Sequence, residues 1–151
     1  MAISARDALS KYKQGVKTGV EDFTPHRLIQ MLLNGALEKI SMAKGFMQQE
    51  GAQAIASKGE QISWAISIID GLKVSLDKSV DGGTGLVENL EDLYTYMEQR
   101  LIEANLLNKV EYLDEVTHLL KEIKTGWDAI PQELIQEHAN QMAKESDDPA
   151  A

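Results

Sequence analysis

The sequence predicts an all-α protein, an antiparallel up-and-down four-helix bundle with a short N-terminal cap segment and an extra C-terminal helical segment. Its 151 residues include three prolines and no cysteine, and 43% of them are hydrophobic while 5% are aromatic. Leu, Ile, Ala and Met dominate the apolar residues, which favours helix. In four separate stretches the apolar residues recur every three or four positions, the period of one helix face.

The first predicted helix covers residues 25–49. Thr24 precedes Pro25, and a threonine hydroxyl can cap the free amides of a first helical turn, where proline is also well tolerated. Phe23 and Leu28 stand at the two positions of a hydrophobic staple. One apolar stripe then follows the helix, and it consists of Ile29, Leu32, Ala36, Ile40, Ala43 and Met47.

The second predicted helix covers residues 52–77. Gly51 interrupts the first helical pattern, and Ser57 with Glu60 has the spacing of a capping box. The glycine-containing stretch 77–85 that follows predicts a loop, because glycine disfavours helix. The stripe of the second helix consists of Ile55, Ile62, Ala65, Ile69, Leu72 and Leu76.

The third and fourth predicted helices cover residues 85–107 and 109–128. Between them, Asn108 and Glu111 have the spacing of a capping box in which Asn replaces Ser or Thr. Because every connection between helices is short, successive helices are expected to run antiparallel. The two stripes are Leu86, Leu90, Leu93, Met97, Leu101 and Ala104, then Leu113, Val116, Leu120, Ile123 and Trp127.

Residues 1–144 are predicted to form a single domain, since a chain of this length suffices for one buried core. Pro131 opens a shorter helical segment over residues 131–144, which we expect to dock weakly. Residues 145–151 have no apolar anchor and are predicted to be disordered.

The charge of the chain argues against several classes of partner. Fifteen basic and 24 acidic residues give a formal net charge of −9, which repels nucleic acid and anionic membrane surfaces. The absence of cysteine excludes disulfides and thiolate chemistry. We expect a soluble protein without membrane insertion or a secretory signal, because no apolar run reaches the length of a membrane span.

The first two helices carry more apolar residues than one stripe needs. The additional residues point about a quarter-turn or more away from the main stripes, and they are Leu28, Met31, Gly35, Met42 and Phe46 on the first helix and Trp64 and Ile68 on the second. A methionine-rich groove can repack around different apolar side chains, which suits the binding of an amphipathic helix. Two interpretations stay open: a terminal segment of the chain covers these residues, or a partner does. A weakly anchored N-terminal segment that a partner displaces would satisfy both.

No catalytic site, metal site or cofactor is predicted. His118, Leu120 and Lys121 resemble the phospho-accepting segment of histidine phosphotransfer bundles, so phosphotransfer through His118 is the alternative function. Glu122 stands where those bundles have glycine, and Glu115 adds negative charge near an incoming phosphoryl group. Glu115 and His118 also have the Glu-x-x-His spacing of di-iron bundles, but such a site needs two of these pairs and two further inward-pointing glutamates, and the sequence has only one pair.

Several short motifs follow one another in order between residues 12 and 127. An N-terminal Tyr12 precedes a helix of the form Pro-x-x-Leu-Ile-x-Met-Leu that Pro25 opens, followed by a small-residue patch at Gly35. The later motifs are Ser75-Leu76-Asp77, Gly82-Gly83, Asn89-Leu90, Leu93-Tyr94, Arg100-Leu101, Ala104-Asn105 and Val116 to Leu120 with Trp127. As an ordered set they resemble the flagellin-specific export chaperones of bacterial flagella. Leu33 and Asn34 depart from the Tyr and Asp that this family often has, and the segment after Pro131 lies outside its pattern.

This resemblance implies a cytoplasmic chaperone that binds the disordered C-terminal region of flagellin, prevents premature polymerisation and helps to deliver the cargo to the flagellar type III export gate. It implies no enzymatic activity, and a bundle whose N-terminal cap shifts when cargo binds. We expect Leu9 and Tyr12 to belong to the cap and the gate-docking segment. We expect the cargo to contact the additional apolar residues, because an unfolded cargo needs an extended apolar surface. A weak homodimer of the free protein is left open.

Overall fold

The computed structural model describes residues 24–76 and 85–146. These residues form five helices, and no strand occurs among them: α2 Pro25–Met47, α3 Ala52–Val74, α4 Leu86–Leu107, α5 Val110–Asp128 and α6 Gln132–Ser146. The prediction of an all-α fold is confirmed. The expected cap segment with Leu9 and Tyr12, the loop around residues 77–84 and the end of the predicted tail lie outside the described residues.

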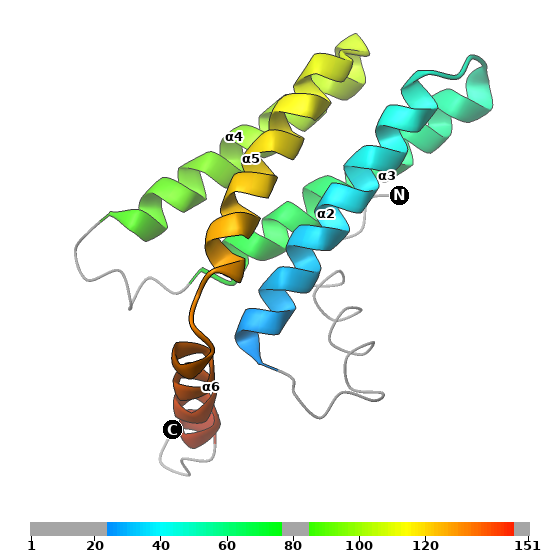
Figure 1. Ribbon diagram of the computed structural model, residues 1–151. Coiled ribbons are helices and arrows are strands. Elements are labelled where there is room, and N and C mark those ends of the chain that lie inside the picture. Colours follow the sequence, from blue (N-terminus) through cyan, green and yellow to red (C-terminus); the bar gives the residue numbers. More distant parts are fainter. Residues whose placement is uncertain (1–23, 77–84, 147–151) are drawn as a thin grey trace.

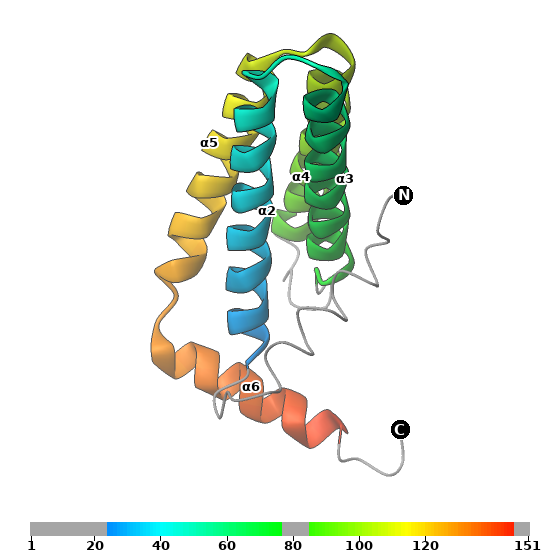
Figure 2. The same cartoon turned by 90° about the vertical axis from the view of Figure 1, so that its right-hand side faces the viewer.

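Helices α2 to α5 form an up-and-down bundle (Figure 1). Each helix packs against the next in the sequence, and α5 packs against α2, so the four helices close into a ring. Consecutive helices run in opposite directions along the bundle, as the short connections predict. Helix α6 lies beyond one end of the bundle and runs across it (Figure 2).

The core lies inside this ring, and all four helices contribute to it. The largest side chains that it encloses completely are Leu32, Leu33, Ile40, Ile62, Ile68, Ile69, Leu72, Met97, Leu101, Leu113, Val116 and Leu120. Most of them belong to the predicted stripes. Ile55 and Leu86 were also expected in the stripes, but they are 64% and 60% exposed, because each lies in the first turn of its helix, at the margin of the packed region.

The start of α2 follows the prediction. The Thr24 hydroxyl accepts a hydrogen bond of 3.0 Å from the backbone N–H of Arg27, and Pro25 occupies the first helical position. These two features satisfy or remove amides that a helix start otherwise leaves without a partner. The helix ends at Met47, two residues earlier than predicted.

The capping box predicted from Ser57 and Glu60 is wrong. Helix α3 begins at Ala52, directly after Gly51, whose φ of +106° is open to glycine and strained for other residues. The chain therefore reverses sharply at Gly51 and enters the helix at once, which places Ser57 within α3. The helix ends at Val74 rather than at residue 77.

The capping box predicted from Asn108 and Glu111 is also wrong, because Asn108 ends α4 instead of starting α5. It adopts a left-handed conformation with φ of 51°, which Asn tolerates better than most residues. The ammonium of Lys58, a buried side chain of α3, donates hydrogen bonds of 3.1 Å to the Asn105 carbonyl and to the Asn108 side chain. This lysine therefore ties the end of α4 to α3.

Helix α6 makes little contact with the bundle. Leu134 is 56% exposed, whereas Ile135 is partly buried beside the first turn of α2. The helix continues to Ser146, so the prediction of disorder is wrong for residues 145 and 146. Among the described helices, none combines the length and the apolar character that crossing a membrane requires.

Candidate functional site

Two methionines and a phenylalanine remain accessible on one flank of α2. Met42 is 40% exposed, and Met31 and Phe46 are partly buried. They share a side of the helix because their separations of 11 and 4 residues are close to three turns and one turn. This flank faces away from α5, which packs on the side of α2 that carries His26 and Lys44.

Helix α3 adds Trp64 to this flank. The Trp64 ring is partly buried against the core, and the Lys39 ammonium of α2 lies 5.4 Å from the ring centroid, within the range of a cation–π interaction. Because Lys39 faces Trp64 and Met42 is three residues further along α2, the tryptophan lies beside the methionines. We call Met31, Met42, Phe46 and Trp64 the methionine-lined surface.

Three residues that were expected to face outward on this flank do not. Ile68 has no exposed surface, Leu28 is 8% exposed, and Gly35 is buried. Leu28 and Ile68 belong to the hydrophobic core. The reason is that each helix of the ring packs against two others, α2 against α3 and α5 and α3 against α2 and α4. The buried arc of each helix is therefore wider than one stripe, and it includes Leu28 and Gly35 on α2 and Ile68 on α3.

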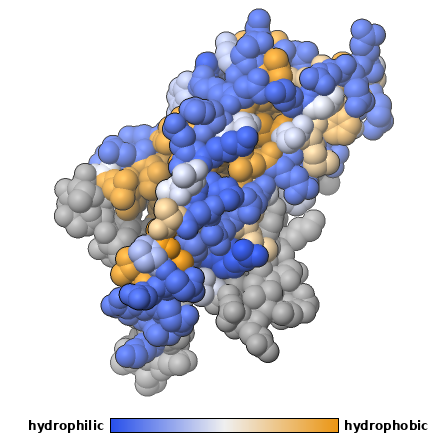
Figure 3. Space-filling model, viewed as in Figure 1, coloured by the Kyte–Doolittle hydropathy of each residue, from blue (hydrophilic) through white to orange (hydrophobic). Residues whose placement is uncertain are grey.

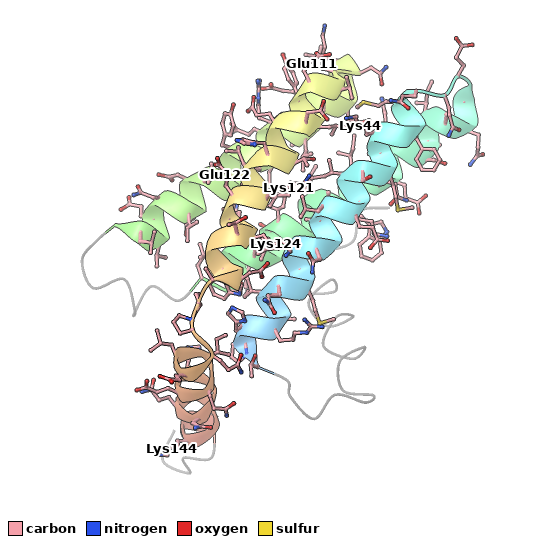
Figure 4. All side chains as sticks on the ribbon, viewed as in Figure 1. Lys44, Glu111, Lys121, Glu122, Lys124 and Lys144 are labelled. Atoms are coloured by element: carbon pink, nitrogen blue, oxygen red, sulfur yellow. The ribbon has the colours of Figure 1, made fainter. Side chains whose placement is uncertain are left out.

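Charge is distributed unevenly around the bundle. Helix α2 carries three basic residues and one acidic residue, whereas α4 carries one basic and five acidic residues. Lys44 of α2, labelled in Figure 4, forms an ion pair with Asp114 of α5, 2.7 Å away. Figure 3 shows the face formed by α2 and α5 as mostly hydrophilic, with apolar residues mainly in the seam between the two helices and near the start of α4.

The start of α2 and the end of α5 are held together by a reciprocal contact. The His26 and Trp127 rings stack with centroids 5.1 Å apart, and the Trp127 indole N–H donates to the His26 carbonyl at 3.0 Å. The His26 Nε2 lies 2.8 Å from the Trp127 carbonyl, to which it donates when it carries a proton. Beside them, Lys124 and then Gln30 donate hydrogen bonds to Asp128 and hold the pKa of that carboxyl below its ordinary value.

A pocket of about 330 Å³ opens next to this contact, between the first turn of α2, the end of α5 and the first turn of α6. Polar side chains line most of it, among them Arg27, Gln30 and Gln136. Such a lining differs from the apolar pockets that hold most small organic ligands. The pocket is therefore less suited to an apolar ligand than the methionine-lined surface is.

A second polar cluster joins α4 to α5. The Arg100 guanidinium donates two hydrogen bonds of 3.2 Å to the Glu115 carboxylate and lies 3.9 Å from the centroid of the Tyr112 ring. The Tyr96 hydroxyl also donates to Glu115. The bonds from Arg100 and then from Tyr96 lower the pKa of Glu115. These contacts join α4 to α5, so they give Arg100, Tyr96 and Glu115 a structural role.

The phosphotransfer alternative finds no support in the surroundings of His118. Its Nε2 lies 3.1 Å from the Glu122 carboxylate one turn further along α5, and the side chain is 73% exposed. A carboxylate in that position repels an incoming phosphoryl group. In the ranges 24–76 and 85–146, no three His, Asp or Glu side chains gather into a group that could hold a metal ion.

Comparison with known proteins assigns the chain to a family. Residues 8–134 match the family described as flagellar protein FliS. The chain is 46% identical over 127 residues to flagellar secretion chaperone FliSB of Pseudomonas aeruginosa, covering 83% of this chain and 97% of that protein. It is 40% identical over 124 residues to flagellar secretion chaperone FliS of Salmonella typhimurium (81% and 88%) and 36% identical over 129 residues to that of Vibrio cholerae (85% and 91%).

Proposed function

Because this chain belongs to the FliS family of flagellar secretion chaperones, we propose that it binds the disordered C-terminal region of flagellin in the cytoplasm, prevents premature polymerisation and helps to deliver flagellin to the flagellar export gate. The family is a chaperone family and not an enzyme family. The motifs between Tyr12 and Trp127, which resemble flagellin-specific export chaperones, support flagellin as the cargo.

The observation that carries this proposal is the methionine-lined surface. A segment that folds on binding gains free energy from apolar contacts spread along its length, because it must offset the entropy lost on ordering. Met31, Met42 and Phe46 extend over about four turns of α2 and offer such contacts, and flexible methionines can adjust to the side chains that they meet. Lys39 adds a positive charge within the same surface.

In this proposal, cargo binding and docking at the export gate use different parts of the chain. Leu9 and Tyr12 belong, in this proposal, to a cap that shifts when cargo binds and that docks at the export gate. No nucleotide is needed, since binding the unassembled flagellin lowers the concentration that is free to polymerise. Release then depends on competition at the gate or on unfolding of the complex.

The test measures binding of a labelled flagellin C-terminal peptide to the full chain by fluorescence anisotropy, and helix gained on mixing by circular dichroism. Wild type is expected to bind one peptide per chain with a gain of helix. The Met31→Asp and Phe46→Asp double variant is expected to bind at least about tenfold more weakly, because two apolar contacts are replaced by charges that must be desolvated.

The matched control is Leu134→Asp, which places the same charge on an exposed leucine of α6. It is expected to bind the peptide as wild type does, and all variants are expected to keep the wild-type thermal melt. Equal binding by the double variant and wild type would contradict the assignment of the surface. A wild-type chain that binds no flagellin peptide would contradict the proposed function.

A further inference from the structure

Half of the methionines of this chain lie on a single helix. The chain has six methionines and no cysteine, and α2 carries Met31, Met42 and Met47. Because cysteine is absent, every sulfur atom of the chain is a methionine thioether. Such a thioether is a common target of oxidants, which convert it to a sulfoxide. Oxidation of sulfur in this chain therefore means oxidation of methionine, and α2 holds half of the targets.

The methionines that the structure describes differ in their access to solvent. Met42 is 40% exposed, Met31 is partly buried, and Met97 of α4 has no exposed surface. Met47 is partly buried and packs against the core. An oxidant must reach the sulfur before it can react, so susceptibility follows exposure. We expect Met42 and then Met31 to be oxidised well before Met97.

Oxidation changes the chemistry of the methionine-lined surface. With hydrogen peroxide, a lone pair of the methionine sulfur attacks one peroxide oxygen and the O–O bond breaks. The proton of the attacked oxygen moves to the other oxygen, which leaves as water. The sulfur gains one oxygen and loses two electrons, and the peroxide is reduced. The resulting sulfoxide is polar, so an apolar cargo side chain that packs against it leaves its oxygen without a hydrogen-bond partner.

We propose that Met42 and Met31 form a reversible oxidation switch, in which peroxide converts both to sulfoxides and weakens flagellin binding while the bundle stays folded. This inference rests on the proposed function and adds the regulation of the same surface. The two residues are eleven positions apart, about 16 Å along α2, so their oxidation removes apolar contacts at two places along an extended cargo. Methionine sulfoxide reductases, with a thiol as electron donor, return the sulfoxide to methionine and release its oxygen as water.

The bundle is expected to stay folded because the methionine at its centre is protected. Met97 is completely enclosed by the core, where a sulfoxide oxygen would lie among apolar side chains and destabilise the fold. The same enclosure keeps the oxidant away from its sulfur. On α2, by contrast, a sulfoxide at Met42 remains in contact with water. A limited dose of peroxide therefore separates the loss of binding from the loss of fold.

The test treats the full chain with hydrogen peroxide, removes the peroxide and measures three properties. Mass spectrometry gives the sulfoxide fraction at each methionine, fluorescence anisotropy gives the affinity for a flagellin C-terminal peptide that lacks methionine, and circular dichroism gives the thermal melt. A dose that oxidises Met42 and Met31 but spares Met97 is expected to lower the affinity at least about tenfold with an unchanged melt. Sulfoxide reductases specific for each sulfoxide epimer, supplied with dithiothreitol, are expected to restore the affinity.

The matched control is the Met31→Leu and Met42→Leu double variant, which keeps apolar side chains of similar size at both positions. It retains the other four methionines of the chain. Without peroxide it is expected to bind the peptide as wild type does, and the same dose is expected to leave its affinity unchanged. A second variant, Met42→Gln, places a permanent polar group at the most exposed of the described methionines and is expected to bind severalfold more weakly without any oxidant.

Three results would overturn the inference. The first is an unchanged affinity of the wild-type chain after Met42 and Met31 have been oxidised. The second is an equal loss of affinity in the treated double variant, which would assign the effect to another methionine. The third is a melt that falls together with the affinity, which would make the oxidation a loss of fold. In all three cases binding by the untreated wild-type chain leaves the proposed function intact, whereas an untreated chain that binds no peptide would overturn both.

Discussion

Individual side chains on the flank of α2 and α3 differ in their exposure to solvent, and their spacing in the sequence does not predict this difference. The helical period places Trp64 and Ile68 on the same side of α3, one turn apart, yet Trp64 is partly accessible and Ile68 has no exposed surface. The period gives the angle between residues on one helix. It does not give the width of the arc that the neighbouring helices cover, and that width decides which residue remains available to a partner.

This difference predicts opposite results for two matched substitutions. Ile68→Asp puts an unpaired charge into the core and is expected to lower the free energy of unfolding by more than about 4 kcal/mol. Met31→Asp changes a partly exposed position and is expected to lower it by less than about 1 kcal/mol. Urea unfolding followed by circular dichroism measures both values. Similar losses in the two variants would mean that Met31 is as much a core residue as Ile68.

At the scale of helices, the sequence predicts the four bundle helices well and their ends less well. Proline after threonine defines the start of α2, because this pair is typical of a helix N-terminus. The capping roles predicted for Ser57 and Asn108 were wrong, since the same residue types serve in helix interiors and at either end of a helix, although the predicted starts at residues 52 and 109 agree with Ala52 and Val110 to within one residue. The choice at Asn108 depends on Lys58, which lies 50 residues away in the sequence and donates to its side chain.

The contact between α4 and α5 predicts a dependence of stability on pH. Arg100 and Tyr96 lower the pKa of Glu115 in the folded chain, so the folded state binds that proton less readily than the unfolded state does. Ionised Glu115 therefore stabilises the fold above the ordinary glutamate pKa of about 4.3. This contribution to stability is lost as the pH falls through the lowered pKa of Glu115.

Glu115→Gln is accordingly expected to be less stable than wild type at pH 7 and to differ less from it near pH 3. Urea midpoints at the two pH values give the comparison. In an Arg100→Gln background the same substitution is expected to have a smaller effect, because the principal partner is already gone. A difference between Glu115→Gln and wild type that stays constant with pH would contradict the role of the pair.

For the whole molecule, the sequence predicts the architecture of the bundle because its four stripes and short connections leave few other arrangements. The sequence predicts the candidate site only in part. It indicates surplus apolar residues on the first two helices, and Met31, Met42, Phe46 and Trp64 are indeed accessible to different degrees. The sequence analysis missed two exposed apolar residues of α4, Ile102 and Leu106, which are 48% and 77% exposed. The signal was present, since both fall outside the predicted stripe of their helix.

The arrangement of α6 predicts that the bundle is stable without it. A chain that ends at Ile130 removes a helix that makes little contact with the other four, and the melting temperature is expected to stay within about 2 °C of the wild-type value. Circular dichroism at 222 nm records the melt, and hydrogen exchange of the full chain is expected to be fast in α6 and slow in α2 to α5. A loss of more than about 5 °C would show that α6 supports the bundle.

The positions of the two tryptophans have a practical consequence. Trp64 belongs to the methionine-lined surface, whereas Trp127 stacks on His26 where the first and last helices of the ring meet. The chain has no further tryptophan. Replacing either ring with phenylalanine leaves a single tryptophan, whose emission can be excited selectively over that of the four tyrosines. Stopped-flow emission can then time the arrival of a ligand and the parting of the helix ends as separate events, without any attached dye.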